Sequence, residues 1–327
     1  MLNLKIFPKA WNILLGSMKR FLGLASSHSN ENSTMLIYQH TPKTGGSSLK
    51  LAIESQYDKS ELLYIYDLEN RVSKKDITWY QNYYHNISKR KKRRMKCILG
   101  HSAGGFVGVI NKPLKAFSIL RNPVDRALSL YYYGLSLPED TRYKFARIIK
   151  DNNLKIEQIF GEDLKKYVDI NDPYSPFNEF FNGQIRSILR PKRHELKWFL
   201  CGPKEKDDSL EKEALEAAIK ILDDYYTVGF QEHFEESMDL FSHEFGWKGN
   251  LYHRVNVTPK RLSVNEIPKD LRDVIADHNR LDFVLYETMY EKFKKKSNFY
   301  QLAIEHESTS FLPSQLYKSS HFNIKTT

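Results

Sequence analysis

The chain has 327 residues, of which 41% are hydrophobic and 28% charged, and its formal net charge is +10. This apolar content predicts a packed core and excludes a disordered chain. Two cysteines exclude a disulfide scaffold and a four-cysteine zinc site. The basic balance favours an anionic partner: a nucleotide, an acidic glycan, a nucleic acid or an anionic membrane.

The first 34 residues are expected to lie outside the folded domain. In residues 1–24, apolar residues recur at helical spacing and the lysines lie elsewhere, which predicts a basic amphipathic helix that either lies on an anionic membrane or packs on the domain. The longest uncharged stretch, Ala10–Met18, is shorter than the about 20 residues of a membrane span. Residues 25–34 are typical of a polar linker. We therefore expect a cytoplasmic protein with at most a peripheral membrane contact.

A single ordered domain is predicted over residues 35–297, followed by a tail at 298–327 for which no structure is predicted. Short apolar runs predict buried strands at 35–40, 97–100, 114–120 and 225–229. Helices are predicted at about 47–56, 123–133, 210–222, 234–245, 268–278 and 282–296. Residues 57–96 indicate a polar, increasingly basic insertion with some helix. Strands that alternate with helices predict an α/β fold, a three-layer sandwich around a central, mostly parallel sheet.

The most informative segment lies between the first predicted strand and the first predicted helix. It reads His-Thr-Pro-Lys-Thr-Gly-Gly-Ser-Ser over residues 40–48. Gly45 and Gly46 allow a tight turn whose amides converge on an anion at the helix N-terminus, and Lys43 adds a positive charge. The hydroxyl donors of this loop are Thr44, Ser47 and Ser48. A turn that merely caps a helix is the alternative, and the strand–loop–helix context argues against it.

A second candidate site begins where the third predicted strand ends. Arg121 closes that strand, and Ser129 lies about two turns into the following helix. A guanidinium group offers a planar fork of donors to phosphate oxygens, and a serine hydroxyl adds a neutral donor. The alternative is an arginine that caps a sheet edge beside a solvated serine.

The loop at 40–48 resembles the 5′-phosphosulfate loop of the carbohydrate sulfotransferases related to heparan sulfate uronosyl 2-O-sulfotransferase. Its lysine precedes the glycine pair, whereas the nucleoside-triphosphate loop has lysine directly after its last glycine. The resemblance extends from about 35 to 296, with weaker matches at 182–186, 228–247, 256–258 and 279–286.

This resemblance implies a parallel sheet like that of the P-loop nucleotide kinases, with 3′-phosphoadenosine 5′-phosphosulfate (PAPS) as the sulfuryl donor and no metal. By analogy with the family, the 5′-phosphosulfate is held by Lys43, Thr44, Gly45, Gly46, Ser47 and Ser48. Arg121 and Ser129 correspond to the residues that hold the 3′-phosphate. Asn256 and Thr258 correspond to a late loop that closes over the nucleotide, and Lys43 also takes part in catalysis.

Transfer of a sulfuryl group to an alcohol requires a base for the hydroxyl proton, and histidine suits this role because it titrates near neutrality. His101 follows the predicted strand 97–100 in a glycine-rich turn, at the strand end where ligand crevices lie. Its position resembles the catalytic histidine of the uronosyl enzymes, although Leu99 replaces the first histidine of their His-Gly-His pattern. The alternative is a histidine that caps the turn. For His40, the next candidate, we expect a structural hydrogen bond.

Two features stay open between interpretations. The basic run at 89–96 either attracts an anionic acceptor, such as an acidic glycan, or is a solvated loop. Arg186 contacts either the acceptor or the cofactor. The predicted function is in-line sulfuryl transfer from PAPS to the hydroxyl of an acceptor, with a carbohydrate favoured and no nucleic acid expected. A nucleotide-dependent phosphotransferase and a non-catalytic polyanion-binding protein are the alternatives.

Overall fold

The computed structural model describes residues 34–66, 77–169, 172, 175–190, 196, 198, 207–248 and 261–310, with side chains up to Ser297. Strands in these residues form one five-stranded sheet in the order β2-β3-β1-β4-β5, and every pairing is parallel. The strands are β1 Met35–Gln39, β2 Leu62–Tyr64, β3 Cys97–Gly100, β4 Leu114–Leu120 and β5 Tyr226–Phe230. The predicted α/β fold is confirmed.

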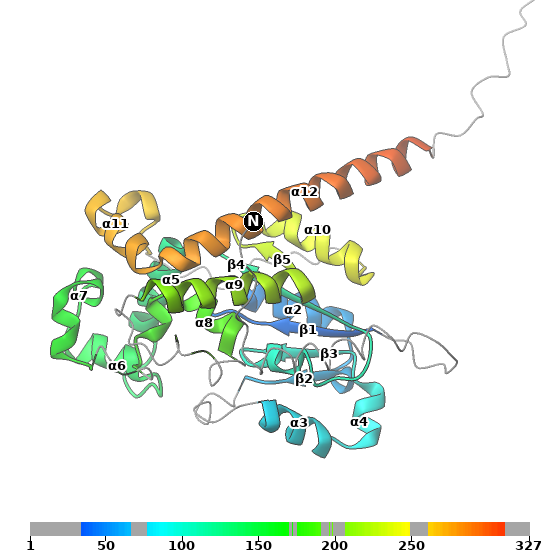
Figure 1. Cartoon of the computed structure of the whole chain (residues 1–327), viewed down its shortest axis with the longest axis horizontal. Coiled ribbons are helices and arrows are strands. Elements are labelled where there is room, and N and C mark those ends of the chain that lie inside the picture. The colour runs from blue at the N-terminus through cyan, green and yellow to red at the C-terminus, as the bar shows by residue number, and fades with distance from the viewer. Residues whose placement is uncertain are drawn as a thin grey trace, which may run out of the picture.

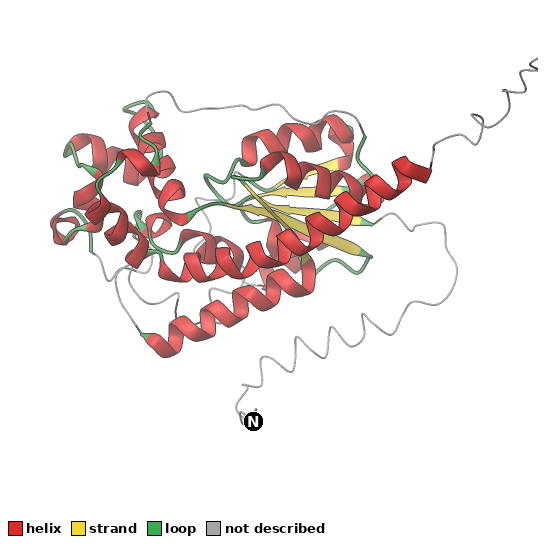
Figure 2. Cartoon of the chain, turned by 90° about the horizontal axis from the view of Figure 1, so that it is seen from above, coloured by secondary structure: helices red, strands yellow, loops and turns green. Residues whose placement is uncertain are grey.

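Helices cover both faces of the sheet, which makes three layers (Figures 1 and 2). Alternate residues of β1 face opposite layers, as the two-residue period of a strand requires. Leu36 and Tyr38 pack with α2 (Gly46–Gln56) and α10 (Phe234–Phe245). Met35 and Ile37 pack toward the layer of α3 (Ile77–Asn86). Two further helices, α8 (Gly183–Leu189) and α9 (Asp208–Tyr225), pack against the β4 and β5 end of the sheet.

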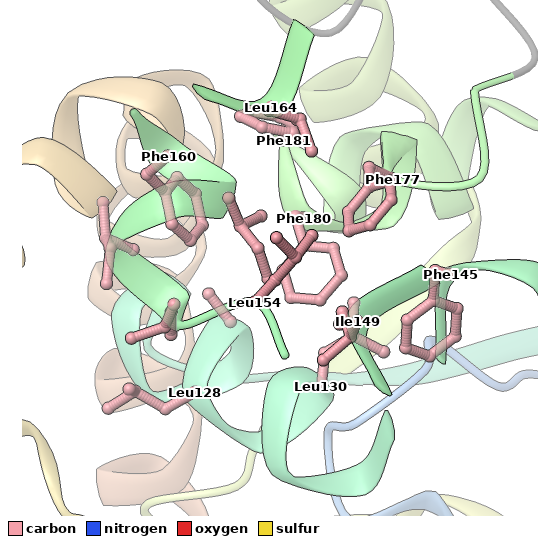
Figure 3. Close-up of a cluster of buried hydrophobic side chains, with 14 of the residues drawn as sticks. Leu128, Leu130, Phe145, Ile149, Leu154, Phe160, Leu164, Phe177, Phe180 and Phe181 are labelled. Atoms are coloured by element: carbon pink, nitrogen blue, oxygen red, sulfur yellow. The ribbon is translucent and has the colours of Figure 1, made fainter. Parts of the chain in front are cut away.

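A helical lobe lies beside the sheet, next to the carboxyl ends of the strands. It contains α5 (Pro123–Ser136), α6 (Lys144–Asp151), α7 (Ile156–Phe160) and α11 (Lys269–His278). These helices share a second core rich in phenylalanine, which includes Phe160, Phe180 and Phe181 (Figure 3). Because α5 belongs both to this core and to the chain that leaves β4, the lobe fixes the position of α5 against the sheet.

Two segments differ from the sequence-based expectation. The insertion at 57–96 contains the edge strand β2 as well as α3 and α4 (Lys89–Arg94). A strand of three residues is too short to show a period, so it was missed. The last helix, α12 (Arg280–Ser310), continues past residue 297, where the predicted tail begins. None of the described helices is long and apolar enough to cross a membrane. Residues 1–33 lie outside the described residues.

Buried amide side chains join α8 to the start of α12. The Asn182 Oδ1 atom accepts from the amides of Leu281 and Asp282, at 3.1 and 3.3 Å. In return, the amide of Asn182 donates to Asn279 Oδ1 at 2.9 Å. The Asn182 side chain therefore accepts from amides in the first turn of α12, and the Asn279 side chain accepts from the amide that precedes α8. These amides have no acceptor within their own helix.

The same connection reaches the end of β4. The carboxylate of Asp282 accepts from the amides of Gln184 and Ile185, both at 2.9 Å, and burial raises the pKa of this carboxyl. The side chain of Gln184 in turn accepts from the amide of Arg121 at 2.9 Å and donates to its carbonyl at 2.8 Å. These contacts fix the backbone of Arg121, the first residue after β4.

Candidate functional site

The candidate site lies at the carboxyl edge of the sheet. The chain leaves β1 at His40, β3 at His101, β4 at Arg121 and β5 at Gln231. In a parallel sheet all these exits lie at one edge, which is where open α/β sheets bind ligands. The topology therefore brings together the predicted phosphate loop, the predicted base and the predicted 3′-phosphate arginine.

Both glycines of the loop are required by close contacts. Gly45 precedes α2 with a left-handed φ of 86°, and a Cβ on it would lie 2.4 Å from Gln231 Oε1. A Cβ on Gly46 would lie 1.9 Å from His40 Nε2. Among the described residues no side chain caps α2, so the amides of its first turn face outward as an anion-binding end.

The loop hydroxyls have different surroundings. The buried Thr44 hydroxyl donates to the Thr41 carbonyl at 2.9 Å, so it closes the loop on itself. Ser48 is buried, whereas Ser47 is exposed. The predicted donor role of Thr44 would thus fall to its backbone amide, and the hydroxyl of Ser47 is the one open to solvent.

Two arginines hold the backbone of the loop. Arg121 Nη1 donates to the Lys43 carbonyl at 3.0 Å, and Arg126 Nε donates to the Pro42 carbonyl at 3.1 Å. Lys43 itself adopts a left-handed φ of 68°, which is uncommon for a residue with a Cβ. Its ammonium group lies 3.9 Å from the centre of the Tyr133 ring.

Arg126 is a site residue that the sequence analysis missed. Its side chain is 1% exposed, and it pairs with Glu179 at 3.0 Å. Its guanidinium group lies against Gly183, where a Cβ would be 2.4 Å from Nη1. Arg126 stands five residues after Arg121 in the sequence, and nothing in that spacing distinguishes a buried arginine from a solvated one.

Positive charge accumulates around the loop. Burial lowers the pKa of Lys43, and the nearby charges of Arg121, Arg126 and Arg261 act in the same direction, so that together they bring it to about 8. Asp125 is the acidic residue that joins two of these arginines: it accepts from Arg121 Nε at 2.8 Å and from Arg261 Nη2 at 2.5 Å. The cluster retains an excess of positive charge, which suits a multiply charged anion.

Ser129 lies inside this cluster. Asp125, Ser129 and Tyr133 follow one another at intervals of four residues, so they form one stripe along α5. One end of the stripe carries the arginines bound to Asp125, and the other carries the ammonium group on Tyr133. Ser129 is buried between them, and its hydroxyl makes no hydrogen bond to any residue the structure describes.

His101 is held by the same loop. Its Nδ1 lies 2.7 Å from the His40 carbonyl, and because a carbonyl can only accept, this nitrogen carries the proton. In the neutral ring Nε2 is therefore the basic atom. The Gln39 side chain also donates to the His101 carbonyl at 2.9 Å. The geometry fits a base whose orientation is fixed, as the prediction for His101 requires.

The predicted structural role of His40 has a clear geometric basis. Its Nδ1 lies 3.0 Å from the hydroxyl of Tyr66, and its ring centre lies 4.5 Å from that of His101. Burial lowers the pKa of His40 well below its usual range, and the charges of His101 and Lys43 act in the same direction. The imidazole of His40 thus contacts Gly46 of the loop as well as the candidate base, His101.

Other predicted residues lie elsewhere. The buried Arg186 donates to the Phe181 carbonyl at 3.1 Å, and its guanidinium group lies 4.4 Å from the centre of the Trp198 ring. The basic run forms α4, which leads into the amino end of β3 and so lies at the edge of the sheet opposite the site loops (Figure 1). Within it, Lys91 Nζ donates to the Ser60 carbonyl at 3.0 Å. Asn256 and Thr258 lie outside the described residues.

The parallel sheet, the glycine loop before α2 and the surrounding cations define an α/β protein with a candidate anion-binding site at the carboxyl ends of its strands. A family model described as the Sulfotransferase family matches residues 30–291, so the chain belongs to the sulfotransferase family and is a transferase. A comparison with curated proteins finds no match. The narrower resemblance to the uronosyl 2-O-sulfotransferases stays a prediction.

Proposed function

We propose that this sulfotransferase transfers the sulfuryl group of PAPS to a hydroxyl group of an acceptor, with a carbohydrate as the favoured acceptor class. The observation that carries this proposal is the hydrogen bond from Arg121 to the Lys43 carbonyl, at 3.0 Å. It supports the proposal because it joins the loop before α2 to the start of α5, and we expect each of these two elements to bind an anion. PAPS carries two separate phosphate groups, and two adjacent cationic sites match that feature.

The residues divide between these two groups of the donor. The first turn of α2 and Lys43 would hold the 5′-phosphosulfate, whose departing phosphate oxygen gains negative charge during transfer. Arg121 and Ser129 would hold the 3′-phosphate. The carboxylate of Asp125 keeps Arg121 and Arg261 close together, so that their donors are ordered before the anion binds.

His101 is the proposed base. The acceptor oxygen attacks sulfur, the bond between sulfur and the bridging phosphate oxygen breaks, and the hydroxyl proton passes to His101 Nε2. The products are the sulfate ester and adenosine 3′,5′-bisphosphate. The His40 carbonyl fixes the tautomer, because it requires a proton on Nδ1 and thus leaves Nε2 as the basic nitrogen.

Calorimetric titration with adenosine 3′,5′-bisphosphate, adenosine 5′-phosphate and ATP tests the donor. We expect the bisphosphate to bind most tightly, because it alone has both phosphates where the two cationic elements lie. Preference for ATP would contradict the proposal. Incubation with radiolabelled PAPS and a panel of acidic glycans, neutral glycans and small alcohols then tests the acceptor class.

A further inference from the structure

The side chain of Lys43 has an unusual environment for a lysine that is to contact an anion. Its ammonium group lies 3.9 Å from the centre of the Tyr133 ring, within the range of a cation–π contact. Among the described residues, no carboxylate lies within ion-pairing distance of this group. The ring of Tyr133 is therefore its principal attractive partner in the part of the chain that the structure describes.

The backbone allows this side chain little choice of direction. The carbonyls of Pro42 and Lys43 are both held by arginines, at 3.1 and 3.0 Å, and the φ of Lys43 is 68°. The starting point of the side chain is thus fixed by the loop. The position of the ammonium group at the far end of the side chain then depends on the groups that surround it.

The charged groups around Lys43 oppose the protonated state. Arg121, Arg126 and Arg261 all lower its pKa, in addition to burial. The nearby carboxylates are bound to these arginines: Asp125 pairs with Arg121 and Arg261, and Glu179 pairs with Arg126. An aromatic face acts in the opposite direction, because its negative quadrupole stabilises a cation without adding a competing anion. A carboxylate in the same place would instead repel the donor.

Tyr133 is itself held in place by the helical lobe. Its ring meets that of Tyr143 edge-on at 6.0 Å, and it packs against the phenylalanine-rich core. It also lies one helical turn beyond Ser129 on α5, so the ring and the Ser129 side chain share one face of that helix.

We propose that Tyr133 is a positioning residue for sulfuryl transfer, which holds the Lys43 ammonium group beside the donor site and keeps it protonated. This inference rests on the proposed function, since it assigns Lys43 to the donor. The property that matters is the aromatic face and not the hydroxyl group.

The test compares Tyr133→Leu with Tyr133→Phe over a range of pH. In Tyr133→Leu we expect the alkaline limb of turnover to move by about half a pH unit or more toward lower pH, because the lysine loses the partner that favours its charged form. The affinity for adenosine 3′,5′-bisphosphate, measured by calorimetry, should begin to fall at a correspondingly lower pH. Tyr133→Phe keeps the ring, so its turnover and its nucleotide affinity should depend on pH as they do in the wild type.

Two further variants make the outcome decisive. Tyr132→Leu removes the adjacent tyrosine, whose ring pairs with Tyr131, and should leave both pH profiles unchanged. If Lys43→Ala alters neither turnover nor nucleotide affinity, the proposed function fails. If Lys43→Ala impairs them but Tyr133→Leu leaves both pH profiles where they were, only the role of Tyr133 is refuted.

Discussion

The contact between Gly46 and His40 predicts that the Gly46→Ala substitution destabilises the protein. The added Cβ would lie 1.9 Å from His40 Nε2 and 2.1 Å from its Cδ2. The imidazole cannot easily withdraw, because its Nδ1 is bound to Tyr66 at 3.0 Å and its ring packs against His101 and Tyr38. Overpacking of this kind typically costs about 1–3 kcal/mol.

Urea denaturation measures this cost, and a double-mutant cycle identifies its cause. The His40→Ala substitution removes the obstructing ring, so Gly46→Ala should cost much less in that background. We expect a coupling free energy of about 1–2 kcal/mol between the two positions. The neighbouring Ser47 is exposed, and Ser47→Ala should change stability by less than about 0.5 kcal/mol. Equal losses from Gly46→Ala with and without the His40 ring would refute the steric argument.

Three predictions concern the donor and the base. Arg121→Ala should weaken the binding of adenosine 3′,5′-bisphosphate by about 1.5–3 kcal/mol and that of adenosine 5′-phosphate much less, and equal losses in calorimetry would remove Arg121 from the 3′-phosphate site. His101→Gln should lower turnover by about 10²–10⁴-fold while nucleotide affinity changes only a few-fold, since Gln cannot take the proton; an active variant would leave His101 only a positioning role. Wild-type turnover should fall as pH rises through about 8, where the Lys43 ammonium group loses its proton, and Lys43→Ala should show no such limb.

The positions of several candidate site residues in the fold could be predicted from local sequence. The loop at 40–48, the arginine at the end of β4 and the histidine after β3 each stand directly after a buried strand, so their common edge follows from parallel topology alone. Glycine positions were informative for the same reason, because the need for a missing Cβ is a local property. The expectation that the sheet is mostly parallel was confirmed.

The contacts made over long sequence distances were not predictable. Arg126 and Arg121 look alike in sequence, and only the fold decides that Arg126 is buried against Glu179. The ring of Tyr133 is one of three consecutive tyrosines, and the sequence does not say which of them meets Lys43. The basic run was predicted to be either an acceptor-binding patch or a solvated loop. It forms the helix α4, which lies near the amino ends of the strands, whereas the candidate site lies at their carboxyl ends.

The amide contacts between α8 and α12 have a consequence for how this protein is made. Asp282 binds the amide of Gln184 across 98 residues of sequence, and Gln184 holds the backbone of Arg121. During synthesis the phosphate loop and Arg121 emerge long before Asp282 does. A nascent chain that ends ahead of α12 would therefore carry the proposed donor-binding residues without the hydrogen bonds from Asp282 that order them. We expect such an intermediate to have no measurable affinity for the nucleotide. Binding of the nucleotide would then stabilise the fold only after α12 has been synthesised.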